Sequence, residues 1–421
     1  MNASKKEKSD FPQTFTIALY LAVGVCCGIA MTKWKPDATV SLPGLLLHLL
    51  VMFALLYASI LIQVFLHEFG HTLFGLMTGY RFLSMRVGSA MLLRRKGNLR
   101  FGFFSADGPF GQSQLLPPET DNGIYPSGLY FLGGVILNFL SATVFGVLFF
   151  VGTGYGLLRI FYLFLALFGA VMALTGGIPM QANGVDNDAR NAILLHCRPE
   201  ARDAFYRQMQ IMEQTANGVR LRDMPEEWFE MPSPEGMQNA LISATAVLAC
   251  KRLVDAHEFE KADRRIHALL NAETGISDVS RVTMRCDSYF CELAGERRPR
   301  VLASRLDAQQ RKQMKVMRTN LTVLRTEYLN ALLVDVDTKK AEAFGKKLDR
   351  CAASTPYPVD AKAEQELLEI AQRAPKEHEM TLEEAMKFNE AEMPEIEMTL
   401  EEAMCFDSSA VIHNSDPVQK G

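Results

Sequence analysis

The chain has 421 residues, of which 48% are hydrophobic, and a formal net charge of −4 at pH 7. This length accommodates two or three domains, and the charge provides no basic excess of the kind that binds nucleic acid. We therefore expect no nucleic-acid partner. The average composition hides a division, because the long apolar runs lie before about Gly177 and charged, Leu- and Ala-rich sequence follows.

Four apolar stretches are long enough to cross a bilayer, whose hydrocarbon core of about 30 Å requires about 20 residues of helix. They are Phe15 to Met31, Leu45 to about Met77, Tyr130 to Val151, and Leu157 to about Leu174. No small-residue cleavage site follows the first stretch, so we expect it to be retained and not removed as a signal peptide. The sequence thus predicts a multi-pass membrane protein with the lipid bilayer as its surroundings.

Basic residues near the ends of these stretches predict the orientation, because cytoplasmic loops carry an excess of Lys and Arg. Three lysines precede the first stretch, and the loop from Gly79 to Tyr125 carries six basic residues. The six are Arg81, Arg86, Arg94, Arg95, Lys96 and Arg100. We expect a cell-membrane location with both termini in the cytoplasm.

The second stretch contains a metal motif, His67-Glu68-Phe69-Gly70-His71. Residues four apart lie on one helix face, so both imidazoles can reach one Zn²⁺ ion. Glu68 lies beside them and can take a proton from water as it attacks a carbonyl group. Polar groups within a membrane segment are costly, and by default they are functional. The alternative is a helix end at the interface, where these residues meet lipid headgroups.

The loop from Gly79 to Tyr125 is too polar to form another span. Aromatic and β-branched residues around Val87 to Phe104 predict hairpin strands in this loop. An ordinary basic loop that binds anionic headgroups is the alternative.

The third and fourth stretches supply further polar candidates. Asn138 follows Gly133 and Gly134, and it either forms an interhelical hydrogen bond or supports the active site. Because a catalytic zinc usually has three protein ligands, a third ligand must come from elsewhere. The Gly- and Pro-interrupted segment after Leu174 offers Asp186 and Asp188, and irregular backbone at membrane depth is tolerated where it lines a polar cavity. Both aspartates could instead cap the following helix.

These features resemble the site-2 protease-like intramembrane metallopeptidases of the bacterial M50 family. The resemblance covers roughly Leu45 to Asn191 and rests on the His-Glu-x-x-His motif, the Gly-Gly-x-x-x-Asn pattern ending at Asn138, and the later proline-containing turn. It implies that Asp188 is the third zinc ligand, since eight residues separate Pro179 from Asp188, as in one bacterial branch of the family. In such proteins a hairpin beside the active site can pair with an extended substrate.

Two positions depart from the family pattern. Gly176 stands where the family usually has Asn, and Ala189 stands where it usually has Gly after the aspartate. Asn138 or Asn183 could supply a substrate-contacting amide in place of the missing one. Loss of activity is the other interpretation of these changes.

The remainder of the chain reads as successive helices from about Gln238 to Ile370, with two helical hairpins that resemble each other. Tetratricopeptide-like repeats and a plain helical bundle are both compatible with this pattern. After Pro375 the tail repeats Glu379–Met386 as Glu397–Met404, and each acidic copy begins with a capping-box pattern. We expect a mostly disordered tail that either binds a protein partner or serves as a solvated linker.

The predicted fold is an all-α polytopic membrane protein with a short β-hairpin element and a cytoplasmic α-helical domain. The predicted domains are a membrane metalloprotease domain (1–190), a helical domain (191–374) and a tail (375–421). The expected function is zinc-dependent hydrolysis of membrane-anchored or membrane-delivered polypeptides near the cytoplasmic leaflet. The alternative is an inactive membrane scaffold that binds partners through its helical domain. A di-iron oxidase ranks low, because it would require several more His-rich motifs.

Overall fold

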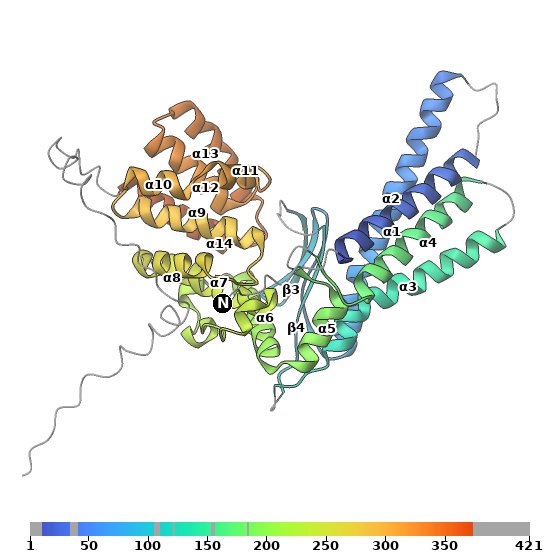
Figure 1. The fold of residues 1–421 in the computed structure, drawn as a ribbon, viewed down its shortest axis with the longest axis horizontal. Helices are drawn as coiled ribbons and strands as arrows, with labels where there is room; N and C mark the ends of the chain where they lie inside the picture. The colour runs from blue at the N-terminus through green and yellow to red at the C-terminus, as the bar shows by residue number, and fades with distance from the viewer. Residues whose placement is uncertain are drawn as a thin grey trace, which may run out of the picture. The chain divides into compact units, whose positions relative to one another are not determined.

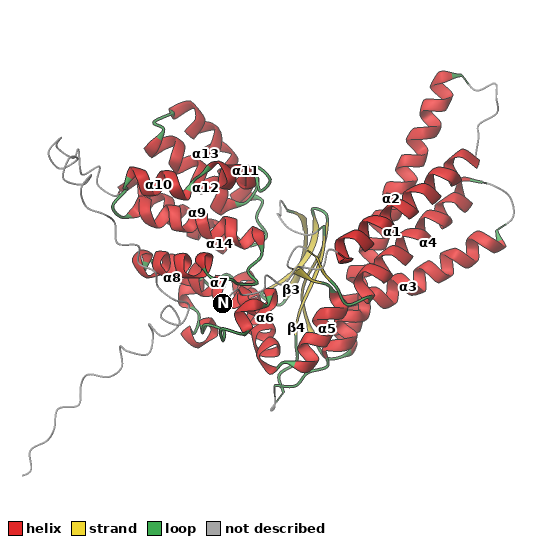
Figure 2. Cartoon of the chain, viewed as in Figure 1, coloured by secondary structure: helices red, strands yellow, loops and turns green. Residues whose placement is uncertain are grey.

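The structure is a computed structural model, and it describes residues 11–33, 41–104, 110–120, 123–152, 156–182 and 185–373. The chain divides into two compact units, Met1–Asn217 and Gly218–Gly421, and helices predominate in the described part of each (Figure 2). Asn183 and the duplicated tail segments lie outside the described residues.

Four apolar helices form much of the first unit, in agreement with the predicted stretches. They are α1 (Phe11–Lys33), α2 (Leu42–Met77), α3 (Ser127–Val151) and α4 (Leu157–Gly177). Within the described ranges, α2, α3 and α4 are long and apolar enough to cross a membrane, and α1 contains a shorter apolar segment. Helices α2, α3 and α4 pack against one another, and α1 packs on α4 (Figure 1).

Helix α2 buries polar side chains and exposes apolar ones, which is the opposite of a helix in a soluble protein. Its buried positions are mostly polar or small, and they include Gln63, Glu68 and His71. Its exposed positions include Leu50 and Phe53, which are 66% and 59% exposed. A soluble helix would bury its apolar face. Polar residues of a membrane helix instead face the interior of the bundle.

Helices α2 and α3 meet through two glycines. A Cβ atom on Gly70 would collide with the backbone of Gly133, and one on Gly133 would collide with the backbone of Gly70. Small residues at such a crossing allow two helix backbones to approach closely. This contact brings the histidines of α2 against α3.

Four antiparallel strands follow α2, namely β1 (Arg81–Val87), β2 (Ala90–Arg95), β3 (Asn98–Phe103) and β4 (Gly111–Leu116). Their order in the sheet is β3-β2-β1-β4. The predicted hairpin is confirmed as β2–β3, whose two-residue turn places Lys96 and Gly97 at φ 48° and 80°. The sheet is larger than predicted, because β4 returns to pair with β1 across more than twenty intervening residues.

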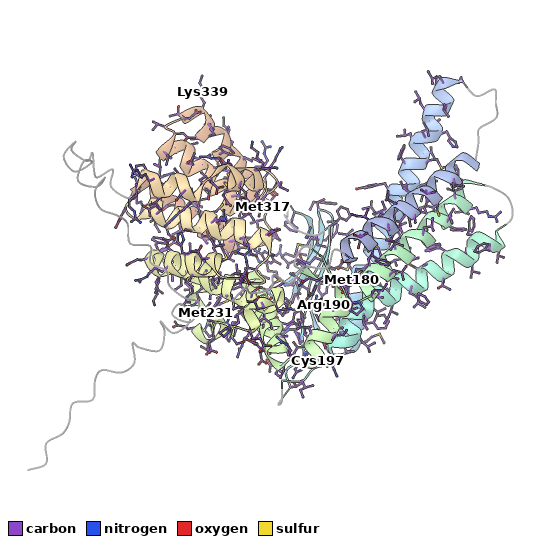
Figure 3. All side chains as sticks on the ribbon, viewed as in Figure 1. Met180, Arg190, Cys197, Met231, Met317 and Lys339 are labelled. Carbon is purple, nitrogen blue, oxygen red and sulfur yellow. The ribbon has the colours of Figure 1, made fainter. Side chains whose placement is uncertain are left out.

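A turn with two short strands, β5 (Gln181–Ala182) and β6 (Val185–Asp186), connects α4 to α5 (Asp188–Cys197) and α6 (Pro199–Asn217). Figure 3 marks Met180 in this turn and Arg190 on α5. Helix α5 packs on α3, and α6 packs on β2 and β4. Both helices therefore belong to the first unit, which ends at Asn217, and the predicted boundary at residue 190 lies within α5.

The second unit is helical throughout its described residues, as predicted for Gln238 to Ile370. Three short 3₁₀ turns (Leu221–Asp223, Glu226–Phe229 and Gly236–Gln238) precede the helices. The helices are α7 (Ala240–Asp255), α8 (Phe259–Asn271), α9 (Asp278–Ala294), α10 (Pro299–Arg305), α11 (Ala308–Met314), α12 (Leu321–Leu329), α13 (Thr338–Ala353) and α14 (Pro358–Arg373). A π-helical turn, Asn330–Val334, extends α12. The two predicted hairpins are α7–α8 and α12–α13, and their likeness to tetratricopeptide repeats stays a prediction.

Candidate metal centre

Three side chains with metal-ligating atoms converge where α2 meets the start of α5. His67 and His71 lie one turn apart on α2, and their Nε2 atoms are 3.2 Å apart. Asp188 Oδ2 lies 3.1 Å from His67 Nε2 and 3.6 Å from His71 Nε2. All three ligand atoms fall within 4.8 Å of one another, so the group could hold a metal ion.

Hydrogen bonds on the far side of each ring fix how the histidines face this centre. His67 Nδ1 lies 2.6 Å from Asn138 Oδ1, and His71 Nδ1 lies 2.8 Å from the carbonyl oxygen of Tyr130. Both oxygens can only accept, so each neutral ring carries its proton on Nδ1 and directs the Nε2 lone pair at the centre. Two lone pairs and a carboxylate that face one another fit a cation, and the donor set of nitrogen and oxygen suits Zn²⁺.

Asn187 positions the third member of the group. Its side-chain oxygen caps α5 by accepting from the backbone N–H of Arg190, and it also accepts from the backbone N–H of Met180. Its Nδ2 donates to the carbonyl oxygens of Thr175 and Ile178, at the end of α4. One amide thus joins the end of α4 to the first turn of α5 and holds Asp188 there.

The neighbouring carboxylate, Asp186, has other partners. Its Oδ1 lies 2.8 Å from Arg190 Nε and accepts from Gln181 Nε2 at 3.0 Å, and only 3% of its side chain is exposed. The structure therefore brings Asp188 to the histidines and uses Asp186 in the turn that precedes α5.

Electrostatics favour the ionised form of Asp188. Burial alone would raise the pKa of this carboxyl group, but the imidazoles of His71 and His67, in the protonated form that they take without a metal ion, outweigh burial. Its pKa consequently lies well below the usual range for aspartate. An ionised carboxylate is the form that binds a metal ion.

Glu68 lies between the sheet and the metal group, the name used below for His67, His71 and Asp188. It is 7% exposed, and Gly111 at the start of β4 packs so closely that a Cβ atom there would collide with Glu68 Oε1. One turn later, the hydroxyl groups of Thr72 and Ser113 are 2.9 Å apart. Strand β4 therefore lies directly on the face of α2 that carries Glu68.

Two more glycines leave space for the ligands. A Cβ atom at Gly134 would lie 2.7 Å from both His67 Nδ1 and His71 Nε2. A Cβ atom at Gly176 would lie 3.1 Å from Asp188 Oδ2 and 3.0 Å from Val135. The absence of a side chain at Gly176, where the resembling family usually has Asn, therefore accompanies a close approach of α4 to Asp188.

The structure brings the predicted ligands His67, His71 and Asp188 together, with Asn138 against His67. Gln63, which contacts Asn138, was not predicted, and neither was Asn187. A signal for Gln63 was present, because it is a polar residue one helical turn before His67 in an apolar segment.

Comparison with known proteins gives no relative: no protein-family model, no curated protein and no solved structure matches this sequence.

Proposed function

We propose that this chain is an intramembrane zinc-dependent endopeptidase that hydrolyses membrane-anchored or membrane-delivered polypeptides near the cytoplasmic leaflet. The observation that carries the proposal is the convergence of His67, His71 and Asp188, with Glu68 buried beside them. Three protein ligands with room for a further one characterise catalytic zinc sites, whereas structural sites have four.

His67 and His71 would bind the ion through Nε2, and Asp188 would bind it through a carboxylate oxygen. A zinc ion in this position would supply Lewis acidity toward a peptide carbonyl group and a water molecule. The backbone and amide oxygens at the two Nδ1 atoms hold both rings in the tautomer that this requires.

Glu68 is the general base in this proposal. Its carboxylate takes a proton from the attacking water while the water oxygen bonds to the carbonyl carbon. The same proton then passes to the amide nitrogen as the C–N bond breaks, which releases a carboxylic acid and an amine. Contact with Gly111 and the burial of Glu68 limit the orientations that the carboxylate can adopt.

The apolar exterior of α2, α3 and α4 supports a membrane location and therefore a membrane-delivered substrate. A peptide bond within a helix is sterically shielded, so the substrate must be extended at the bond that is cut. In the described part of the sheet β4 is an edge strand, and its Gly111 end lies on Glu68. Because Tyr130 already donates to the carbonyl oxygen of Ser113, we place substrate pairing at the Gly111 end of β4.

The second candidate is a silent scaffold that retains the metal group and binds partners through the second unit and the tail. Glycine at position 176, where the resembling family usually has Asn, does not favour the scaffold, because a Cβ atom there would lie 3.1 Å from Asp188 Oδ2. Ala189 is buried within the first turn of α5, where alanine is well suited to a helix.

Metal content of the detergent-purified protein tests the site. We expect about one zinc per chain in the wild type, and loss of that zinc in His67→Ala and Asp188→Ala. Asp186→Ala is the matched control, because it removes a neighbouring buried carboxylate that bonds to Arg190 and Gln181. Folded wild-type protein that takes up no zinc would exclude the proposed site.

Glu68→Gln separates the peptidase from the scaffold. This change removes the general base and preserves the shape of the side chain, so we expect zinc content to persist and substrate cleavage to stop. The measurement compares peptide fragments of membrane proteins from cells that contain either form. Identical fragment patterns would favour the scaffold.

A further inference from the structure

Behind His67 lies a series of side-chain hydrogen bonds, of which the proposed mechanism uses only the first, between Asn138 and His67. Asn138 Oδ1 contacts His67 Nδ1 at 2.6 Å. Asn138 Nδ2 donates to Gln63 Oε1 at 2.9 Å and to the carbonyl oxygen of Gln63 at 3.0 Å. Gln63 Nε2 donates to the carbonyl oxygen of Leu165 at 2.9 Å, and Ser141 Oγ donates to Gln63 Oε1. This series of hydrogen bonds therefore connects α4, through Gln63 on α2 and Asn138 on α3, to His67.

In each of these hydrogen bonds the donor and the acceptor are fixed. The Leu165 carbonyl can only accept, so the amide nitrogen of Gln63 points toward it and Gln63 Oε1 points toward Asn138. That oxygen and the Gln63 carbonyl accept from Asn138 Nδ2, so Asn138 Oδ1 must face His67. A neutral His67 ring then carries its proton on Nδ1 and leaves Nε2 free to bind a metal ion.

Gln63 is an unusual residue for its position. Its exposed fraction is 0%, in a helix whose other residues are largely apolar. Packing alone would be served by Leu or Met, since an amide in this environment is stable only when its polar atoms are bonded. All of the partners of its side-chain atoms lie on α3 or α4, and one of them contacts a metal-ligating histidine.

We propose that Gln63 is a positioning residue, which acts through Asn138 to hold His67 in the tautomer and orientation that bind the metal ion. This inference rests on the proposed zinc function and assigns part of the ligand geometry to a residue that does not contact the metal. Outer partners of metal-bound histidines commonly change metal affinity by about 10- to 100-fold when they are removed.

The test measures binding of Co²⁺ and Zn²⁺ to the full chain in detergent, by chelator competition and by the absorption spectrum of bound Co²⁺. The variants are Gln63→Met and Asn138→Leu, which preserve side-chain volume, together with the double variant. Ser59→Ala is the matched control. Ser59 is also fully buried on α2, but its hydroxyl bonds to the carbonyl oxygen of Leu55, away from the chain of hydrogen bonds.

We expect Asn138→Leu to weaken metal binding by about 10- to 100-fold. Gln63→Met should weaken it by a smaller factor and shift the Co²⁺ spectrum in the same direction. Because Gln63 acts through Asn138, the double variant should match Asn138→Leu within about twofold, the usual error of additivity. Ser59→Ala should bind as the wild type does.

Unchanged metal affinity and Co²⁺ spectrum in folded Gln63→Met would overturn the inference. A double variant whose loss of affinity equals the product of the two single losses would also overturn it. If Gln63→Met does not fold, Ser141→Ala removes the second hydrogen bond to Gln63 Oε1. It should reduce Co²⁺ affinity in the wild-type background and have no effect beside Asn138→Leu; any other result would again count against the inference. A wild type that binds neither metal would instead remove the proposed function on which the inference rests.

Discussion

At the scale of single residues, the metal group requires glycine next to its histidines. Gly134 faces both histidines, and the space that a methyl group would need is occupied by His67 Nδ1 and His71 Nε2. Neither ring can retreat freely, because each is bonded at Nδ1 to an oxygen of α3. A side chain at this position must therefore displace a ligand.

Gly134→Ala should weaken zinc binding by about 10- to 100-fold, the range found when the support of a ligand is disturbed. Chelator competition on the purified protein measures the change. Gly146→Ala is the matched control, since Gly146 lies on the same helix and a Cβ atom there would meet no atom of the described residues within 4 Å. Wild-type affinity in Gly134→Ala would show that the rings move aside without cost.

The residues that could be predicted from the sequence are those whose chemistry depends on local spacing. His67 and His71 are one turn apart in any helix, so their convergence follows from the motif alone. Choosing Asp188 over Asp186 required the family resemblance, because both aspartates precede the same helix. Gln63 and Asn187 act through hydrogen bonds to distant segments, and no local pattern reveals such partners.

At the scale of secondary-structure elements, the sequence predicted a hairpin that has a local turn pattern, and it did not predict a strand that pairs with a distant segment. The hairpin β2–β3 closes through a two-residue turn, which a sequence pattern can indicate. Strand β4 has the polar sequence Gly-Gln-Ser-Gln before two leucines, and its partner β1 is distant in the chain. Its assignment depends on non-local pairing, so the sheet was predicted as a hairpin only.

The helices of the second unit enclose a buried ionic group. Arg325 is 1% exposed and lies 2.6 Å from both Asp287 Oδ1 and Glu364 Oε2. Its guanidinium group also lies over the ring of Phe290. The group connects α9, α12 and α14, so removal of the arginine would leave two carboxylates with no cation between these helices.

Arg325→Met should lower the free energy of unfolding of this unit by about 3–5 kcal/mol, because buried carboxylates lose their partner. Urea unfolding can be followed by thiol labelling at Cys250 and Cys286. Burial raises the pKa of both thiols to about 12, so they react slowly until the unit unfolds.

Lys346→Met is the control for this change, since Lys346 and Glu342 form an ion pair with side chains that are 71% and 66% exposed. Loss of that exposed pair should leave the free energy of unfolding essentially unchanged. Equal effects of the two substitutions would contradict the assigned importance of the buried group.

At the scale of the whole molecule, the metal group and every residue that supports it belong to the unit that ends at Asn217. The sequence predicted the division into an apolar and a charged half from composition. Composition alone does not reveal that the polar helices α5 and α6 pack on α3 and on the sheet, because these contacts join segments far apart in the chain.

A chain that ends at Asn217 should therefore bind zinc with the affinity of the full chain, to within about twofold. Circular dichroism establishes that the shortened chain is folded, and chelator competition gives its affinity. A folded but metal-free product would mean that the second unit is required to complete the site.

The position of Asp188 at the first residue of α5 has a thermodynamic consequence. The carboxylate that faces the histidines belongs to α5, which contacts the next helix, α6, and α6 packs on the sheet. Occupancy of the metal group and docking of these two helices are thus linked equilibria. Whatever loosens α5 and α6 must weaken the hold on the ion, and an ion bound there must strengthen their docking by the same factor.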